Sequence, residues 1–396
     1  MNQSMGTKEL LSLSLAIFCM LFGAGNLLYP LSVGKSAGSL TAFGMIGFFF
    51  TAILLPLTGL VGMILFDGNY NLFFNRLGKK TGSFLIFVCM LIIGPVIVIP
   101  RCITLSHTMI APFIPIIFLQ TINLYSSLTF CLLFLSAAFI TTYRASKIVT
   151  ILGDVIAPIL LASIAFIIGK GIYSAQEPVA TTLAPFTIFK TGFMMGYQTL
   201  DLLGTLFFAS IIITILKKTT HKKDNLHALA LNGLKAGIIG LSLLGLVYIG
   251  MGILGAFHSH DFMNVDAGTL FQLISFSLLG TSGAAIISIS VFLACLSTVI
   301  GLSAVVAEYT KNIIFSGKIN YVQSLCLVLA SSIPLSIFGL SYVLAIAGGP
   351  IVFVGYPVLI TLTLCNIAYK MCNFGYVKTP VAITFLMALA SYFFTL

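Results

Sequence analysis

A series of long apolar stretches, separated by short polar segments, most constrains how this chain can fold. Each stretch holds roughly 20 residues, the length that an α-helix needs to cross the hydrocarbon core of a bilayer. The stretches are continuously apolar, whereas the strands of a membrane barrel alternate over about ten residues. Of the 396 residues, 59% are hydrophobic and only 7% are charged, too few to cover a water-facing surface. The sequence therefore predicts an all-α integral membrane protein.

The apolar stretches predict a single transmembrane domain, residues 1–396, with eleven spans. They are expected at residues 9–33, 40–66, 83–106, 127–142, 148–171, 191–216, 232–257, 283–308, 321–340, 342–365 and 380–396. Residues 107–126 are expected to form a re-entrant or surface helix, and 262–280 an amphipathic external helix. The first stretch is too long for a cleavable signal peptide and is expected to be a retained helix.

The basic residues predict the orientation of the spans. With a cytoplasmic N-terminus, fifteen of the nineteen lysines and arginines fall on the cytoplasmic side. The outer side then holds Lys35, Arg101, Lys170 and Lys190. The net charge of +10 is spread over the loops and forms no basic patch with interleaved aromatic residues, so nucleic acid is not an expected partner. The expected location is the inner (cell) membrane, crossed many times.

Several function classes have no support in the sequence. The eight cysteines lie mostly inside apolar segments, form no CxxC pair and accompany no histidine cluster, so they are interpreted as packing residues. A nucleophile–base pair, a metal cluster and a cofactor motif are also missing, which argues against an enzyme and against a bound cofactor. A channel would need a repeated pore loop or a ring of charges, and neither is visible.

The first span is interrupted by residues that weaken a helix. Gly23, Gly25, Asn26 and Pro30 lie at mid-membrane depth in an otherwise apolar stretch. Unpaired backbone groups there are tolerated only where protein or a water-filled cavity satisfies them. A single Gly-x-Gly would more simply indicate close helix packing. The neighbouring Asn26 and Pro30, and a matching break elsewhere, favour a cavity.

The matching break is in the sixth span, where a polar run that ends in Asp201 follows Gly196. The two breaks occupy equivalent places in two five-helix halves that run in opposite directions. This pattern predicts a 5+5 inverted repeat, roughly 9–171 and 191–365, with an extra helix at 380–396. A substrate site is then expected between the broken helices, as in secondary transporters.

The chemistry of the two breaks suits a small apolar amino acid. The N–H groups of Ala24 and Gly25 would hold a carboxylate at the start of a half-helix. Unwound carbonyls of the sixth span, together with Asp201, would hold the ammonium group; Asp201 could instead pair with a structural partner such as Arg101. The predicted substrate-binding residues are Gly23, Ala24, Gly25, Asn26, Tyr197, Gln198, Thr199, Leu200 and Asp201, with Tyr197 and Leu200 as walls of the pocket.

Motifs along most of the chain resemble the bacterial branched-chain amino acid:cation symporters (the LIVCS or BrnQ family). They are Gly23-Ala24-Gly25-Asn26 with Pro30, Gly94-Pro95 with Pro100-Arg101, Gly192-Phe193 through Gly204, and Ala294-Cys295-Leu296 through Glu308. The resemblance implies the leucine-transporter fold and sodium-coupled symport of leucine, isoleucine or valine by alternating access. Spans one, two, six and seven would then move against spans three, four, eight and nine. The family usually has twelve spans, so eleven or twelve remain open.

The resemblance also implies a sodium site between the first and eighth spans. Its ligands would be the backbone carbonyls of Cys19 and Phe22 with Ala294, Ser297 and Thr298. Oxygen ligands of this kind suit a hard cation. Alternatively, Ser297 and Thr298 bond only to carbonyls of their own helix.

The coupling ion stays open at the sequence level. Asp154 follows Gly153 where the family has asparagine, and it could be a second cation ligand, a proton carrier or a neutral hydrogen-bonded group. The predicted partners are thus a branched-chain amino acid, Na⁺ and the lipid bilayer. The alternative function is a proton-coupled carrier of a small apolar amino acid, with Asp154 or Asp201 as the proton carrier.

Overall fold

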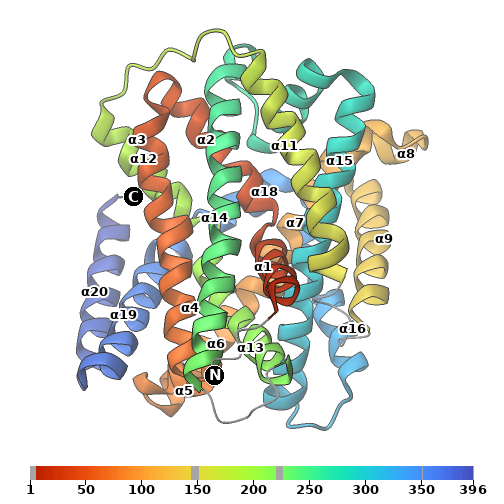
Figure 1. The fold of residues 1–396 in the computed structure, drawn as a ribbon. Coiled ribbons are helices and arrows are strands. Elements are labelled where there is room, and N and C mark those ends of the chain that lie inside the picture. The colour runs from red at the N-terminus through yellow and green to blue at the C-terminus, as the bar shows by residue number, and fades with distance from the viewer. Residues whose placement is uncertain (1–5, 144–150, 220–225, 350, 396) are drawn as a thin grey trace.

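The computed structural model describes residues 6–143, 151–219, 226–349 and 351–395. Over these residues the chain is helical and has no strands, and its longer helices run roughly side by side as an upright bundle (Figure 1). Helices satisfy their own backbone groups, as hydrocarbon requires. Phe84, Ile140 and Phe166 are 68, 73 and 62% exposed, as expected of a surface that faces lipid. These features confirm the prediction of an all-α membrane protein.

The first half of the chain begins with a divided helix and ends with α11. Its helices are α1 (Thr7–Leu21), α2 (Ala24–Ala37), α3 (Thr41–Phe49), α4 (Leu55–Leu65), α5 (Tyr70–Phe74), α6 (Lys79–Leu91), α7 (Val98–Ile110), α8 (Ile117–Gln120), α9 (Leu124–Thr142) and α11 (Ala157–Tyr173). Short 3₁₀- or π-helical segments join some of them: η1 (Gly38–Leu40), η2 (Phe50–Leu54), η3 (Asn75–Leu77), η4 (Ile92–Val96), η5 (Ala111–Phe113) and η7 (Ile151–Ile156).

The second half also begins with a divided helix. Its helices are α12 (Pro185–Tyr197), α13 (Asp201–Thr219), α14 (Leu226–His258), α15 (Ala267–Tyr309), α16 (Tyr321–Ser331), α17 (Ile333–Ser336), α18 (Leu340–Ala347), α19 (Tyr356–Cys372) and α20 (Lys378–Thr395), with the turns η8 (His260–Phe262), η9 (Thr310–Ile314) and η10 (Ile351–Gly355). Gly280 interrupts α15 at a φ of 65°. The segment 267–279 is therefore a separate helical piece, while its external position stays a prediction.

Eight helices in the described part of the chain are long and apolar enough to cross a membrane. They correspond to eight of the eleven predicted spans. The first predicted span is divided into α1 and α2, and the ninth and last correspond to the shorter apolar helices 321–336 and 378–394. The tenth predicted span, 342–365, lies within the candidate span Leu340–Cys372, in which α18 ends at Ala347 and α19 begins at Tyr356.

The helices pack in two groups. In the first, α3 packs along α12, α2 along α14, and α4 along α13. In the second, α15 packs along α7, α9 and α16. These groups correspond to predicted spans one, two, six and seven, and to spans three, four, eight and nine. The broken helices α1, α2 and α13 also contact α15, so both breaks lie where the groups meet.

Two of the predicted cytoplasmic basic residues each lie close to an aromatic ring. The guanidinium carbon of Arg76 is 3.6 Å from the ring centroid of Tyr369, and the Nζ atom of Lys370 is 4.9 Å from that of Phe66. Arg144, Lys147, Lys222 and Lys223, which are also among the fifteen, lie outside the described residues. Arg101, predicted to be on the outer side, is 1% exposed within α7 and therefore lies inside the bundle.

Candidate functional site

The first span is broken between α1 and α2 by an asparagine side chain that replaces helical bonds. The N–H of Gly23 donates to the Oδ1 atom of Asn26 at 3.0 Å, and the N–H of Asn26 donates to the Gly23 carbonyl at 3.1 Å. In a continuous helix these N–H groups would bond to the carbonyls four residues earlier, Cys19 and Phe22. The break therefore frees two buried carbonyls for other partners.

The freed carbonyls face two hydroxyl groups of α15. Ser297 Oγ lies 3.2 Å from the Cys19 carbonyl oxygen, and Thr298 Oγ1 lies 3.1 Å from that of Phe22. Both hydroxyls also bond to the Ala294 carbonyl in their own helix, at 2.7 and 3.2 Å. Ser297 and Thr298 therefore bond to carbonyls of α1 as well as to a carbonyl of their own helix. Five oxygens converge at this point, all of the kind that a hard cation prefers.

The second break, between α12 and α13, contains a strained residue. Leu200 has a φ of 65°, in the left-handed region, which costs a residue with a Cβ atom about 1–2 kcal/mol. The N–H of Leu202 donates to the hydroxyl of Tyr356 at 3.1 Å. In a continuous helix it would bond to the Gln198 carbonyl. Strain of this kind is maintained by surrounding contacts and is concentrated at functional sites.

Asp201 joins the two breaks. Its carboxylate oxygens accept hydrogen bonds from Asn26 Nδ2 at 2.9 and 2.8 Å, and Oδ2 also accepts one from the Tyr248 hydroxyl at 2.7 Å. Asn26 also donates to the Tyr248 hydroxyl. Asp201 is the first residue of α13, where the helix dipole favours a negative charge. One buried network therefore links α2, α13 and α14.

Arg101 occupies the space beside this network. Its Nη1 atom donates to the Gln198 carbonyl at 2.7 Å, and its Nη2 atom donates to the Thr199 carbonyl at 3.2 Å. The guanidinium thus pairs with carbonyls of the second break, while the Asp201 carboxylate pairs with neutral side chains. The direct Arg101–Asp201 partnership considered from the sequence is replaced by this arrangement. The buried Nε atom of Arg101 has no hydrogen-bond partner, and an unsatisfied donor of this kind costs about 1–3 kcal/mol of stability.

A small cavity lies between the two breaks. Its volume is about 20 Å³, room for roughly one water molecule or one ion. It is lined by Met20, Leu21, Gly23, Asn26, Ile93, Val98, Arg101, Thr199, Leu200, Asp201, Gly204, Phe208, Thr298 and Leu302. Sites for small organic ligands usually measure about 300–1,000 Å³. An amino acid could enter here only after the surrounding helices or side chains moved.

The structure brings most of the predicted site residues together. Five predicted substrate-binding residues line the cavity: Gly23, Asn26, Thr199, Leu200 and Asp201. Ala24, Gly25, Tyr197 and Gln198 adjoin the breaks without lining it. Sequence reasoning missed Tyr248, which carries no local signal. It gave Arg101 no role in binding, although a charge inside an apolar span is itself a functional signal.

Asp154 lies apart from the cavity. Its Oδ1 atom accepts a hydrogen bond from the Ser12 hydroxyl of α1 at 2.5 Å, and the residue is exposed. Ser12 precedes Cys19 by seven residues, about 10 Å along the helix. Asp154 is therefore not among the oxygens that converge on α15.

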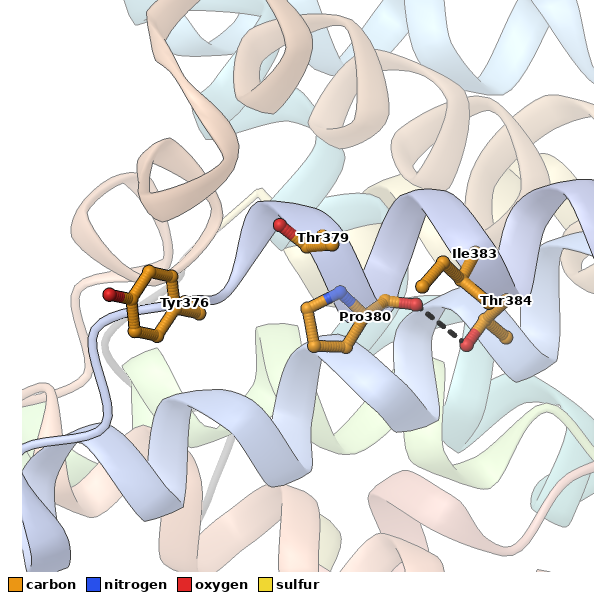
Figure 2. A pocket seen from close by; sticks show the side chains of 5 residues that line it. All are labelled: Tyr376, Thr379, Pro380, Ile383 and Thr384. Atoms are coloured by element: carbon orange, nitrogen blue, oxygen red, sulfur yellow. Dashed lines mark hydrogen bonds between the residues drawn. The ribbon is translucent and has the colours of Figure 1, made fainter.

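A larger cavity, of about 480 Å³, is lined from α20 and the segment before it (Figure 2). The lining residues are Tyr376, Thr379, Pro380, Ile383 and Thr384. The Thr384 hydroxyl in this cavity donates to the Pro380 carbonyl of its own helix at 2.9 Å. The lining includes neither a charged group nor a broken helix, so the smaller cavity is the better candidate site.

Comparison with known proteins agrees with this geometry. The sequence model of the family described as "Branched-chain amino acid transport protein" matches residues 6–395. The chain is 28% identical over 376 residues to the branched-chain amino acid permease BraB of Bacillus subtilis (strain 168), covering 94% of this chain and 82% of the relative. It is also 28% identical over 393 residues to a Staphylococcus aureus (strain USA300) protein named as a branched-chain amino acid carrier, covering 95 and 86%.

These relatives are permeases and carriers, so the family is one of transporters and not of enzymes. Discontinuous helices that face each other inside a helical membrane bundle form the substrate site in many transporters. The chain belongs to the family of branched-chain amino acid transport proteins.

Proposed function

We propose that this chain carries leucine, isoleucine and valine across the cell membrane together with Na⁺, by alternating access. The family and the names of the relatives support the substrate class. The apolar surroundings of the two breaks suit an aliphatic side chain. The paired breaks offer polar backbone groups for the ammonium and carboxylate groups of the substrate.

The observation that carries sodium coupling is the convergence of five oxygens between α1 and α15. They are the carbonyls of Cys19, Phe22 and Ala294 and the hydroxyls of Ser297 and Thr298. The side chains of Ser297 and Thr298 are 0 and 4% exposed, so a cation here would be enclosed by protein oxygens. With a cation bound, both hydroxyls would turn their lone pairs toward it.

The packing of the helices supports alternating access. The first-group helices pack mainly on one another, the second-group helices do likewise, and the site lies between the two groups. Movement of one group against the other would open the site to each side in turn. We also propose the inverted repeat of 9–171 and 191–365, followed by 380–396, with the N-terminus in the cytoplasm.

Proton coupling is the second candidate. Asp201 favours it, because this buried carboxylate is hydrogen-bonded by the neutral side chains of Asn26 and Tyr248. A carboxylate in such surroundings could accept and release a proton during the transport cycle. Sodium coupling is preferred because the oxygens of the α1–α15 cluster have no role in a proton-coupled mechanism.

The deciding experiment is uptake of radiolabelled leucine into proteoliposomes at fixed pH. An inward sodium gradient should drive uptake, and its replacement by potassium should abolish it. Thr298→Ala should lower sodium-driven uptake by about tenfold, because it removes one of five ligands. Ser290→Ala is the matched control, since the Ser290 hydroxyl bonds to the Ile286 carbonyl of its own helix at 2.9 Å.

Two results would contradict the proposal in different ways. Uptake that ignores sodium and follows an acid-outside gradient would establish proton coupling in place of sodium coupling. Absence of uptake of any aliphatic amino acid by protein shown to be folded would overturn the proposed function itself.

A further inference from the structure

We infer that Arg101 and Tyr29 form the subsite for the substrate's carboxylate. In this inference the Arg101 guanidinium binds the carbonyls of Gln198 and Thr199 until the substrate's ammonium group replaces it. This inference rests on the proposed function, since it names the groups that recognise an α-amino acid. It revises the expectation that the N–H groups of Ala24 and Gly25 hold the carboxylate without a charged side chain.

Two buried donors mark the subsite. Arg101 is 1% exposed and Tyr29 is 6% exposed. The Nε atom of Arg101 is fully buried and has no hydrogen-bond partner, and the buried hydroxyl of Tyr29 has no partner besides the Arg101 guanidinium next to it. The two side chains are neighbours, with the guanidinium carbon 5.7 Å from the Tyr29 ring centroid. Buried donors of this kind are normally satisfied, so an acceptor is expected between them in another state of the transport cycle.

The surrounding charges favour an anion. A Cβ atom added to Gly25 would lie 2.8 Å from Nη2 of Arg101, so the guanidinium lies against the first turn of α2. The start of a helix carries free N–H groups and a partial positive charge. A guanidinium next to this positive end attracts a carboxylate and can bind it with two parallel hydrogen bonds.

The carbonyls of Gln198 and Thr199 favour a cation. Gln198 and Thr199 lie just beyond the last residue of α12, where the dipole is negative, and their carbonyls now bind the guanidinium. Asp201 begins the next helix and adds a negative charge nearby. A substrate ammonium group at these carbonyls would make the bonds that Arg101 makes here.

Replacement of Arg101 by the substrate at these carbonyls gives both the ammonium group and the carboxylate of the substrate a binding partner. The cavity of about 20 Å³ is too small for an amino acid, and the guanidinium is part of its wall. When the ammonium group takes the carbonyls of Gln198 and Thr199, Arg101 is released and turns to the carboxylate beside it. Loading then requires both charged groups of the substrate, so an amine without a carboxylate should bind poorly.

The test measures binding of L-leucine and of L-leucinol, in which a hydroxymethyl group replaces the carboxylate. Isothermal titration calorimetry of the purified full chain in detergent, with saturating sodium, gives both dissociation constants. We expect the wild-type protein to prefer leucine strongly. Arg101→Gln should weaken leucine binding by at least about tenfold without weakening leucinol binding. Arg76→Gln is the matched control and should change neither constant.

Tyr29→Phe removes only the hydroxyl of Tyr29. It is the variant to measure if Arg101→Gln does not fold. It should weaken leucine binding by roughly threefold without weakening leucinol binding. An equal loss of both ligands in either variant would indicate a structural role and overturn the inference, as would unchanged leucine binding in Arg101→Gln. Failure of the wild-type protein to bind leucine would instead contradict the proposed function.

Discussion

The amide nitrogen of Asn26 donates to both carboxylate oxygens of Asp201, at 2.9 and 2.8 Å, although the two residues are 175 positions apart. The same Asn26 side chain accepts the N–H of Gly23. The Asn26 side chain therefore stabilises the break between α1 and α2 and links it by hydrogen bonds to the break between α12 and α13. Any change at Asp201 should consequently affect the geometry of both broken helices.

We expect Asp201→Asn to abolish most transport while leaving the fold intact. The amide is similar in shape, but it loses the charge and one acceptor, and hydrogen bonds to charged groups are worth about 1.5–3 kcal/mol. The initial rate of leucine uptake should fall by about tenfold or more. Asp261→Asn, in the exposed turn η8, is the control. Uptake within about twofold of wild type would show that Asp201 is dispensable.

Gly23→Ala should weaken sodium coupling. A Cβ atom at this position would lie 2.9 Å from Oγ1 and 3.2 Å from Cγ2 of Thr298, so it would push the hydroxyl away from the Phe22 carbonyl. Overpacking of this kind costs about 1–3 kcal/mol. The sodium concentration for half-maximal leucine uptake should rise by about tenfold.

Gly204→Ala provides the comparison for Gly23→Ala, because Gly204 lines the same cavity and its added Cβ would make only ordinary contacts at 3.5 Å or more. If the two alanine variants respond to sodium alike, the hydroxyl of Thr298 is not a ligand.

Gly192→Ala should destabilise the protein. The added Cβ would lie 2.0 Å from the carbonyl oxygen of Gly44, so α12 and α3 would have to separate. Small residues at such crossings allow membrane helices to approach closely. We expect a loss of about 1–3 kcal/mol, measured as a lower midpoint of thermal unfolding in detergent.

The control for Gly192→Ala is Gly169→Ala in α11, where an added Cβ would meet nothing within 4 Å. This variant should unfold at the wild-type temperature or slightly above it, because alanine favours a helix. Equal unfolding temperatures for the two variants would contradict a close α3–α12 contact.

Labelling of Cys372 tests the orientation. This exposed thiol ends α19, two residues beyond Lys370 on the predicted cytoplasmic side. In a variant with Cys326→Ser, the other exposed cysteine is removed. A membrane-impermeant maleimide should then label inside-out vesicles and not right-side-out vesicles. The reverse pattern would place the N-terminus outside.

Local features of the sequence determined the helical membrane fold and the positions of both breaks. Continuous apolar stretches specify helices because lipid cannot hydrogen-bond to a free backbone. Gly23 with Asn26, and the polar run ending in Asp201, weaken the helix within a few residues of themselves. For this reason these positions could be read without any knowledge of distant contacts.

Other features depended on contacts between distant parts of the chain. From the sequence alone, Arg101 is a basic residue near the outer end of the span 83–106, whereas the carbonyls of Gln198 and Thr199 bind it inside the bundle. Tyr248 resembles any other aromatic residue of an apolar helix until α14 packs beside Asp201. Hydropathy measures each residue's cost of burial, whereas these roles depend on which partner offsets that cost. Only the tertiary structure decides that partner.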